Sequence, residues 1–91
     1  MLALTDHARS RLQQRGIPAA AVANLLDFGR RCHDHHGATI VFFDHRARNA
    51  LARRVDPAEL RRIEPHFDTY AVIAADGDIV TVGHRTRRIR R

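Results

Sequence analysis

The sequence of 91 residues contains no tryptophan, no lysine, one tyrosine and one cysteine. A single cysteine excludes an intramolecular disulfide, so the chain suits a reducing compartment. No apolar run approaches the roughly 20 residues that a membrane-spanning helix needs. The first residues also lack the apolar stretch of a secretory signal peptide. We therefore expect a cytoplasmic protein that does not enter a membrane.

All sixteen basic residues are arginines, they face ten acidic residues, and the formal net charge at pH 7 is +6. The guanidinium of arginine presents a planar fork of N–H donors that can bind phosphate through two hydrogen bonds. A small domain with this charge suits a polyanionic partner. Composition alone fits either a nucleic-acid-binding domain or a basic surface without a specific ligand.

Two helices are expected at the beginning of the chain. The first spans residues 6–15, with Thr5 as its N-cap and Gly16 directly after its end. The second has Pro18 at its first position and stops at Gly29. Only a short turn separates them, so the two helices are expected to pack as a hairpin.

The middle of the chain predicts two strands and two short helices. Residues 30–36 are interpreted as a polar strand, and residues 38–43 (ATIVFF) as a central strand because they are so rich in apolar side chains. Short helices are expected over residues 45–54 and 56–64, the second beginning with an Asp cap followed by Pro.

The segment TYAVIAADGDIVTVGHR predicts a β-hairpin. The Asp-Gly pair at 76–77 is the preferred centre of a two-residue type I′ turn. Such a turn pairs Ile73 with Val80, which places Val80 in the core, and it pairs Thr69 with His84.

The expected fold is therefore α+β, in one domain over residues 1–91. Two N-terminal helices pack on an antiparallel sheet of about four strands, and short helices are inserted before the C-terminal hairpin. Residues 86–91 are interpreted as a basic C-terminal tail.

Three residues spaced four apart, His7, Arg11 and Arg15, form one row on the first helix. Histidine can transfer a proton near neutral pH, and arginine stabilises the charge that builds on a phosphorane. His84 and Arg85 stand where the last strand ends on a rigid frame. We take His7, Arg11 and His84 as candidate catalytic residues. For the row taken alone, we favour the alternative of a solvated polar face whose arginine stems cover the edge of the core.

Four arginines are candidate nucleic-acid-binding residues because they can reach phosphates from the helix, the strand end or the tail: Arg15, Arg85, Arg87 and Arg88. The alternative for the tail is a frayed end without a specific role. Tyr70 fits core packing or, on an open face of the sheet, stacking on a base.

The stretch CHDHH at 32–36 contains metal-ligating residue types, but its spacing matches no closed site and no second half follows. A polar, partly exposed strand explains it as well. The sequence also lacks a glycine-rich phosphate loop, a nucleophile elbow and an HExxH motif. We therefore predict neither a metal site nor a cofactor.

The motif H-x3-R-x3-R-G-I begins at His7, and it is followed by a helix that ends near Gly29 and by the strand DGDIVTVGHR. This pattern resembles small bacterial proteins of the domain of unknown function 4258 family. That family in turn is similar to the RelE-like ribonuclease toxins, in the barnase, EndoU, colicin and RelE fold class. The resemblance covers most of the chain, and residues 44–66 form a less familiar insert.

The resemblance implies N-terminal helices against a four-stranded antiparallel sheet. It also implies metal-independent cleavage of RNA, in which a 2′-hydroxyl attacks the adjacent phosphate. Carried over to this sequence, it points to His7, Arg11, Arg15, Thr81, His84 and Arg85. The implied partners are RNA, free or on the ribosome, and an acidic antitoxin-like protein. Two alternatives stay open: a nucleic-acid- or ribosome-binding module without catalysis, and a protein-interaction domain. The sequence leaves the oligomeric state open.

Overall fold

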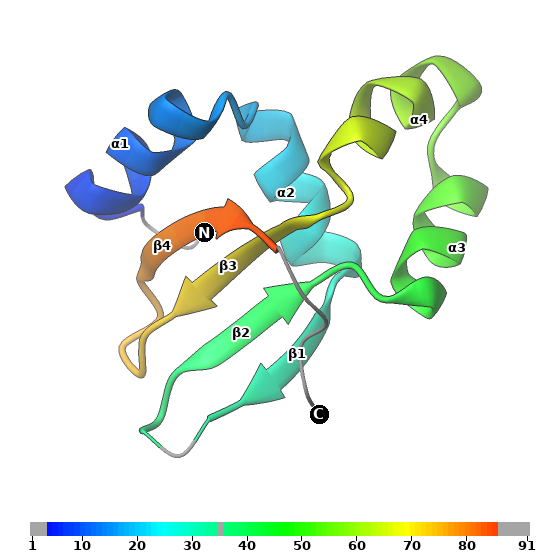
Figure 1. Cartoon of the computed structure of the whole chain (residues 1–91). Helices are drawn as coiled ribbons and strands as arrows, with labels where there is room; N and C mark the ends of the chain where they lie inside the picture. The colour runs from blue at the N-terminus through cyan, green and yellow to red at the C-terminus, as the bar shows by residue number, and fades with distance from the viewer. Residues whose placement is uncertain (1–3, 35, 86–91) are drawn as a thin grey trace.

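The computed structural model describes residues 4–34 and 36–85, which form an α+β fold with four α-helices and a four-stranded antiparallel sheet (Figure 1). This class is the one expected from the sequence. The predicted tail, with Arg87 and Arg88, lies outside the described residues. The elements in chain order are α1 (Asp6–Arg15), α2 (Ala19–Phe28), β1 (Arg30–His33), β2 (Thr39–Phe42), α3 (His45–Arg54), α4 (Pro57–Ile63), the 3₁₀ helix η1 (Glu64–His66), β3 (Thr69–Ile73) and β4 (Ile79–His84).

The strands follow each other across the sheet in the order β1-β2-β3-β4, and every neighbouring pair is antiparallel. Helix α1 packs along β4, while α2 packs on β3 and β2 (Figure 1). Helix α3 packs beside α2, and α4 beside α3. The sheet therefore has one face covered by α1 and α2, with α3 and α4 at the end of β2.

Short polar side chains cap the beginnings of α1, α3 and α4. Thr5, Asp44 and Asp56 each accept a hydrogen bond from the backbone N–H three residues later, at 3.2, 2.8 and 2.8 Å. These bonds satisfy N–H groups that have no partner inside the helix. Gly16 ends α1 in the left-handed region, with φ of 62°, as predicted. Pro18 differs from the prediction, because it occupies the N-cap of α2 rather than its first helical position.

The core lies between the sheet and its two covering helices. Val41, Ala71 and Val82 form one row across three strands, and each is at most 1% exposed. They belong to the same apolar cluster as Ala8 of α1 and Leu25 of α2, which are both fully buried. Alternate residues of a strand point to opposite faces of the sheet, so this buried row identifies the face that α1 and α2 cover.

The β3–β4 loop differs from the predicted two-residue turn. Ala74 N–H donates to Asp78 O at 2.8 Å, and Gly77 N–H donates to Ala74 O at 2.9 Å. Gly77 has φ of 97°, and the described residues include no non-glycine residue with positive φ. A type I′ turn needs positive φ at both central residues, so this loop is instead a three-residue connection that ends in a left-handed glycine.

The longer loop shifts the first pairing of the hairpin by one residue. Ile73 pairs with Ile79, and the prediction that it pairs with Val80 was wrong. Ile79 is 1% exposed and takes the predicted core position of Val80, which is only half-buried. An irregularity at Val80, a β-bulge, then restores the register, so Thr69 pairs with His84 as predicted.

Candidate functional site

Helix α1 runs parallel to β4 from one end of the strand to the other. Thr5 N–H, just before the helix, donates to Ile79 O at the beginning of β4, at 3.0 Å. The main-chain oxygen of Arg15, the last residue of the helix, lies 3.2 Å from Nε2 of His84 at the end of β4. The C-terminal ends of α1 and β4 therefore meet.

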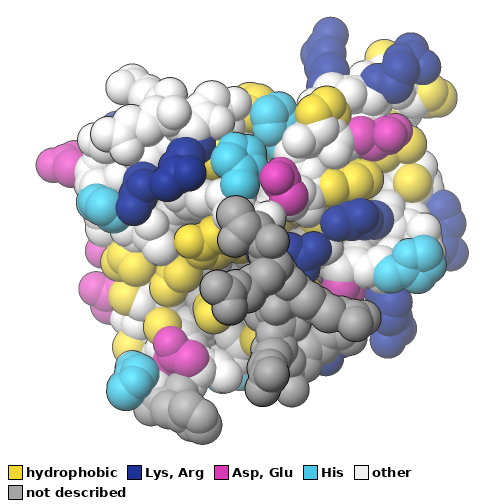
Figure 2. Space-filling view, in the orientation of Figure 1, with side chains coloured by type: hydrophobic (Ala, Val, Ile, Leu, Met, Phe, Trp, Pro, Cys, Tyr) yellow, Lys and Arg dark blue, Asp and Glu magenta, His cyan; other side chains and the backbone are white. Residues whose placement is uncertain are grey.

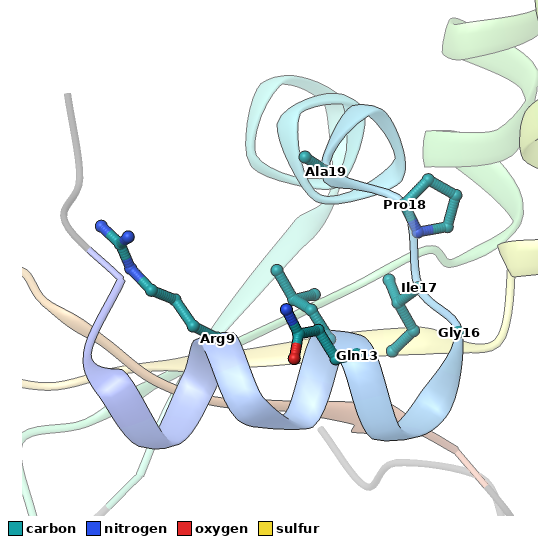
Figure 3. Close-up of a pocket in the computed structure, with 7 residues that line it drawn as sticks. Arg9, Gln13, Gly16, Ile17, Pro18 and Ala19 are labelled. Atoms are coloured by element: carbon teal, nitrogen blue, oxygen red, sulfur yellow. The ribbon is translucent and has the colours of Figure 1, made fainter.

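The α1 row, which comprises His7, Arg11 and Arg15, lies on the side of α1 away from α2. Arg9 and Gln13 project on the other side, where they line an open groove of about 570 Å³ between the two helices (Figure 3). Since β4 is the last strand of the sheet, the α1 row lies on the side of its outer edge. Figure 2 shows histidine, arginine and acidic side chains forming a band along α1 toward the end of β4.

His84 is held between two oxygen acceptors. Its Nδ1 lies 3.0 Å from Oδ1 of Asp68, and its Nε2 lies 3.2 Å from the main-chain oxygen of Arg15. A neutral imidazole has one N–H and can donate to only one of them, whereas the protonated ring can donate to both. The carbonyls at a helix C-terminus also favour a cation.

These contacts shift the protonation of His84. The hydrogen bond to Asp68 is the largest cause, and with the bond to the Arg15 carbonyl it raises the pKa of His84 above its ordinary value of 6.5. Burial and the nearby Arg15 guanidinium oppose this and lower the pKa by less. His84 is therefore a charged proton donor over a wider pH range than an isolated histidine.

Asp68 precedes β3 and anchors His84 and Arg85 at the end of β4. Its carboxylate accepts from the His84 ring, and its main-chain oxygen accepts from the N–H of Arg85 at 2.6 Å. Asp68 was not among the candidate residues chosen from the sequence. The signal for it is the predicted hairpin register, which pairs Thr69 with His84 and so places Asp68 opposite Arg85 at the same strand end.

Arg85 lies on the other face of the sheet from His84, because neighbouring strand residues point to opposite sides. Its guanidinium lies 5.2 Å from the centre of the Phe42 ring, a cation–π contact on the face that α1 and α2 do not cover. Thr81 belongs to this same face. The structure therefore separates Thr81 and Arg85 from the α1 row and His84.

The two candidate catalytic histidines do not lie together. His7 precedes Arg15 by eight residues, a rise of roughly 12 Å along the helix. His7 is thus near the beginning of β4, and Arg11 lies between it and the His84 end. The structure brings Arg15 and His84 together, places Arg11 about one turn away, and leaves His7 at the far end.

Tyr70 lies on the open face of the sheet and is half-buried. A Cβ added at Gly83, its cross-strand partner, would lie 3.1–3.3 Å from Tyr70 ring atoms and its hydroxyl. The glycine therefore lets the Tyr70 ring pack closely over β4. Tyr70 therefore has a packing role, and it packs on the open face of the sheet rather than in the helix-covered core.

The β1–β2 connection uses its polar residues to form a turn. Asp34 Oδ1 accepts from the N–H groups of His36 and Ala38, at 2.8 and 3.0 Å. His33 Nδ1 lies 3.1 Å from Oγ1 of Thr39 on the neighbouring strand. Within residues 4–34 and 36–85, no three His, Cys, Asp or Glu side chains are grouped to hold a metal ion, and His35 lies outside that part.

Comparisons with protein-family models, with curated proteins and with solved structures found no match. The resemblance to the 4258 family and to RelE-like toxins therefore stays a prediction from the sequence motif. Across the described part of the chain, no helix is both long and apolar enough to cross a membrane. The structure thus defines an α+β fold and a histidine–carboxylate pair at the meeting point of α1 and β4.

Proposed function

We propose that this domain binds RNA along the α1 row and cleaves it at His84 without a metal ion. The observation that carries this proposal is the pairing of His84 with Asp68 beside the Arg15 end of the row. A histidine paired with a carboxylate is oriented and more readily protonated, which suits a general acid. The arginines alongside supply cationic groups for the phosphate.

In the proposed reaction, the 2′-hydroxyl of RNA loses its proton to solvent and its oxygen attacks the adjacent phosphorus. The bond between phosphorus and the 5′-oxygen breaks, which leaves a 2′,3′-cyclic phosphate. The departing 5′-oxygen takes a proton from Nε2 of His84, and solvent then reprotonates the ring. Arg11 and Arg15 stabilise the negative charge on the phosphorane. Asp68 acts as a positioning residue that holds the ring and its charge.

The hydrogen bond between Nε2 of His84 and the Arg15 oxygen has to be exchanged for one to the leaving oxygen during this step. His7 takes a different role in the proposal. Since it lies roughly 12 Å along the helix from Arg15, it contacts a neighbouring phosphate rather than the one that is cleaved.

Cleavage of RNA in the presence of a chelator tests the proposal. Wild-type protein is expected to cleave, and His84→Ala is expected to lower the rate by at least about a hundredfold, the range of a lost general acid. His36→Ala is the matched control, because His36 is exposed in the β1–β2 turn and its bond to Asp34 uses the backbone N–H. Equal rates for wild type and His84→Ala would contradict the proposal.

One observation favours a second candidate function, RNA binding without cleavage. Both ring nitrogens of His84 already have partners within the chain. In that case His84 fastens α1 to the sheet, and Arg11 and Arg15 bind phosphates. The expected result is then no cleavage by the wild type, together with an RNA affinity that falls in Arg11→Ala/Arg15→Ala and weakens with salt.

A further inference from the structure

A second concave surface lies at the end of β2 and the beginning of β1, where α3 packs beside α2, whereas the α1 row follows the other edge of the sheet, along β4 (Figure 1). Its volume is about 320 Å³. The wall combines half-buried or buried apolar side chains with charged ones, and it consists of Phe28, Arg30, Asp44, Arg46, Ala47 and Ala50. A pocket of this size lies at the lower end of the range of sites for small ligands.

Helix α3 carries four arginines and no acidic residue. Arg46, Asn49 and Arg53 recur at intervals of three and four residues, so they lie on one side of the helix, and all three are exposed. Arg53 Nε donates to the Asn49 main-chain oxygen at 3.4 Å. Figure 2 shows arginine side chains over α3 and α4, apart from those along α1.

Helix stability accounts for Arg53 and Arg54, which lie in the last turn of α3 where the helix dipole favours cations, but it does not account for Arg46. The first turn of α3 contains Arg46 and no acidic residue. A cation near a helix N-terminus is unfavourable, because the aligned peptide dipoles are positive there. A sequence that departs from a local stability rule in this way often does so at a functional surface.

The one carboxylate of the pocket is buried and engaged within the chain. Asp44 Oδ1 accepts from the N–H of Ala47 at 2.8 Å, and Oδ2 lies 3.5 Å from Nη1 of Arg30. The Asp44 side chain is only 7% exposed, whereas Arg46 at the rim is exposed. The pocket therefore presents an apolar floor and a cationic rim to a ligand.

We propose that this surface, the α3 site, binds one nucleotide of single-stranded RNA. The base lies against Phe28, Ala47 and Ala50, and the phosphates on either side of it contact Arg46 and Arg53. A base splayed out of a single strand can enter an apolar pocket and stack on an aromatic ring, whereas a base in a duplex is paired and stacked. The choice of RNA rests on the proposed function, and the α3 site adds that the RNA is single-stranded.

Binding of a labelled single-stranded RNA, followed by fluorescence anisotropy at several salt concentrations, tests the α3 site. Arg46→Ala/Arg53→Ala is expected to weaken binding about tenfold and to reduce the salt slope by about 1.4. The control, Arg54→Ala/Arg61→Ala, likewise removes two exposed arginines, one from α3 and one from α4. Both of these arginines lie outside the α3 site. It is expected to change the affinity by less than about threefold. Thermal unfolding of both variants verifies that they fold.

Equal losses in the two double variants would overturn the α3 site, since only diffuse charge would then matter. Duplex RNA that binds as tightly as the single strand would overturn it too. The outcome for the α3 site is separate from the outcome for the proposed cleavage at His84. If the wild type cleaves nothing but Arg46→Ala/Arg53→Ala alone loses affinity, the α3 site stands and the cleavage proposal falls. If His84→Ala abolishes cleavage while the two double variants bind alike, the reverse holds.

Discussion

His84 lies between the carboxylate of Asp68 and the main-chain oxygen of Arg15, and only the protonated ring donates to both. The unfolded chain has neither contact. The pKa of His84 is therefore raised on folding, first by the bond to Asp68 and then by the Arg15 carbonyl. Folding and protonation of this one side chain favour each other.

The free energy of unfolding should depend on pH through His84. Because the folded pKa lies above the unfolded value of 6.5, the stabilisation is fully present below that value and is lost as pH rises through the folded pKa. Asp68 is half exposed, so the contribution is expected to be at most about 1 kcal/mol. Urea unfolding of wild type and His84→Ala on both sides of this window measures it. If the unfolding free energies of wild type and His84→Ala differ by the same amount at both pH values, the linkage is contradicted.

The candidate site could be predicted from the sequence only in part. The spacing of the α1 row and the position of His84 at the strand end follow from helical and strand periodicity. The contact between His84 and Arg15 joins residues 69 positions apart, and no local pattern encodes it. The opposite directions of His84 and Arg85 follow from strand geometry, although both were expected to serve one site.

At the scale of elements, Gly29 sets how closely the end of α2 approaches the sheet. A Cβ at this position would collide with the main-chain oxygen of Leu25 and would lie 2.6 Å from Cγ1 of Val41 in β2. Its φ of −65° is ordinary for any residue, so close approach rather than backbone conformation requires glycine here.

Gly29→Ala is expected to lower the free energy of unfolding by about 1–3 kcal/mol, because α2 or β2 must move to admit the methyl group. Ser10→Ala, at an exposed position in the middle of α1, is the control and should change stability by less than about 0.5 kcal/mol. Chemical denaturation of the two variants provides the measurement. Similar stabilities would mean that the packing at this junction is looser than described.

The β3–β4 hairpin shows why its position could be predicted from the sequence but its loop length and register could not. The Asp-Gly pair correctly indicated a turn at 76–77, but the loop formed with three residues, in which only Gly77 has positive φ. Asp76 Oδ1 also accepts from the N–H of Asp78 at 3.0 Å, which stabilises this loop. The bulge at Val80 then buries Ile79. Turn type and bulge depend on packing across the sheet, which local preference does not determine.

At the scale of the whole molecule, two cationic surfaces lie on different parts of the sheet: the α1 row along β4, and the α3 site at the end of β2 beside the beginning of β1 (Figure 1). The net charge of +6 predicted a polyanionic partner, and the fold divides that charge between separate elements. Residues 44–66, the insert that the sequence motif left unassigned, contribute the second surface. The predicted acidic protein partner and the family resemblance stay predictions.

The most direct measurement of the central claim is cleavage of a single-stranded RNA in chelator, with the ends of the products identified. Wild-type protein is expected to produce 2′,3′-cyclic phosphate ends, and His84→Ala to lose them by at least about a hundredfold. The same oligonucleotide with 2′-deoxy residues should remain intact, because it lacks the attacking hydroxyl. An unchanged yield from His84→Ala, or cleavage of the 2′-deoxy oligonucleotide, would contradict the account.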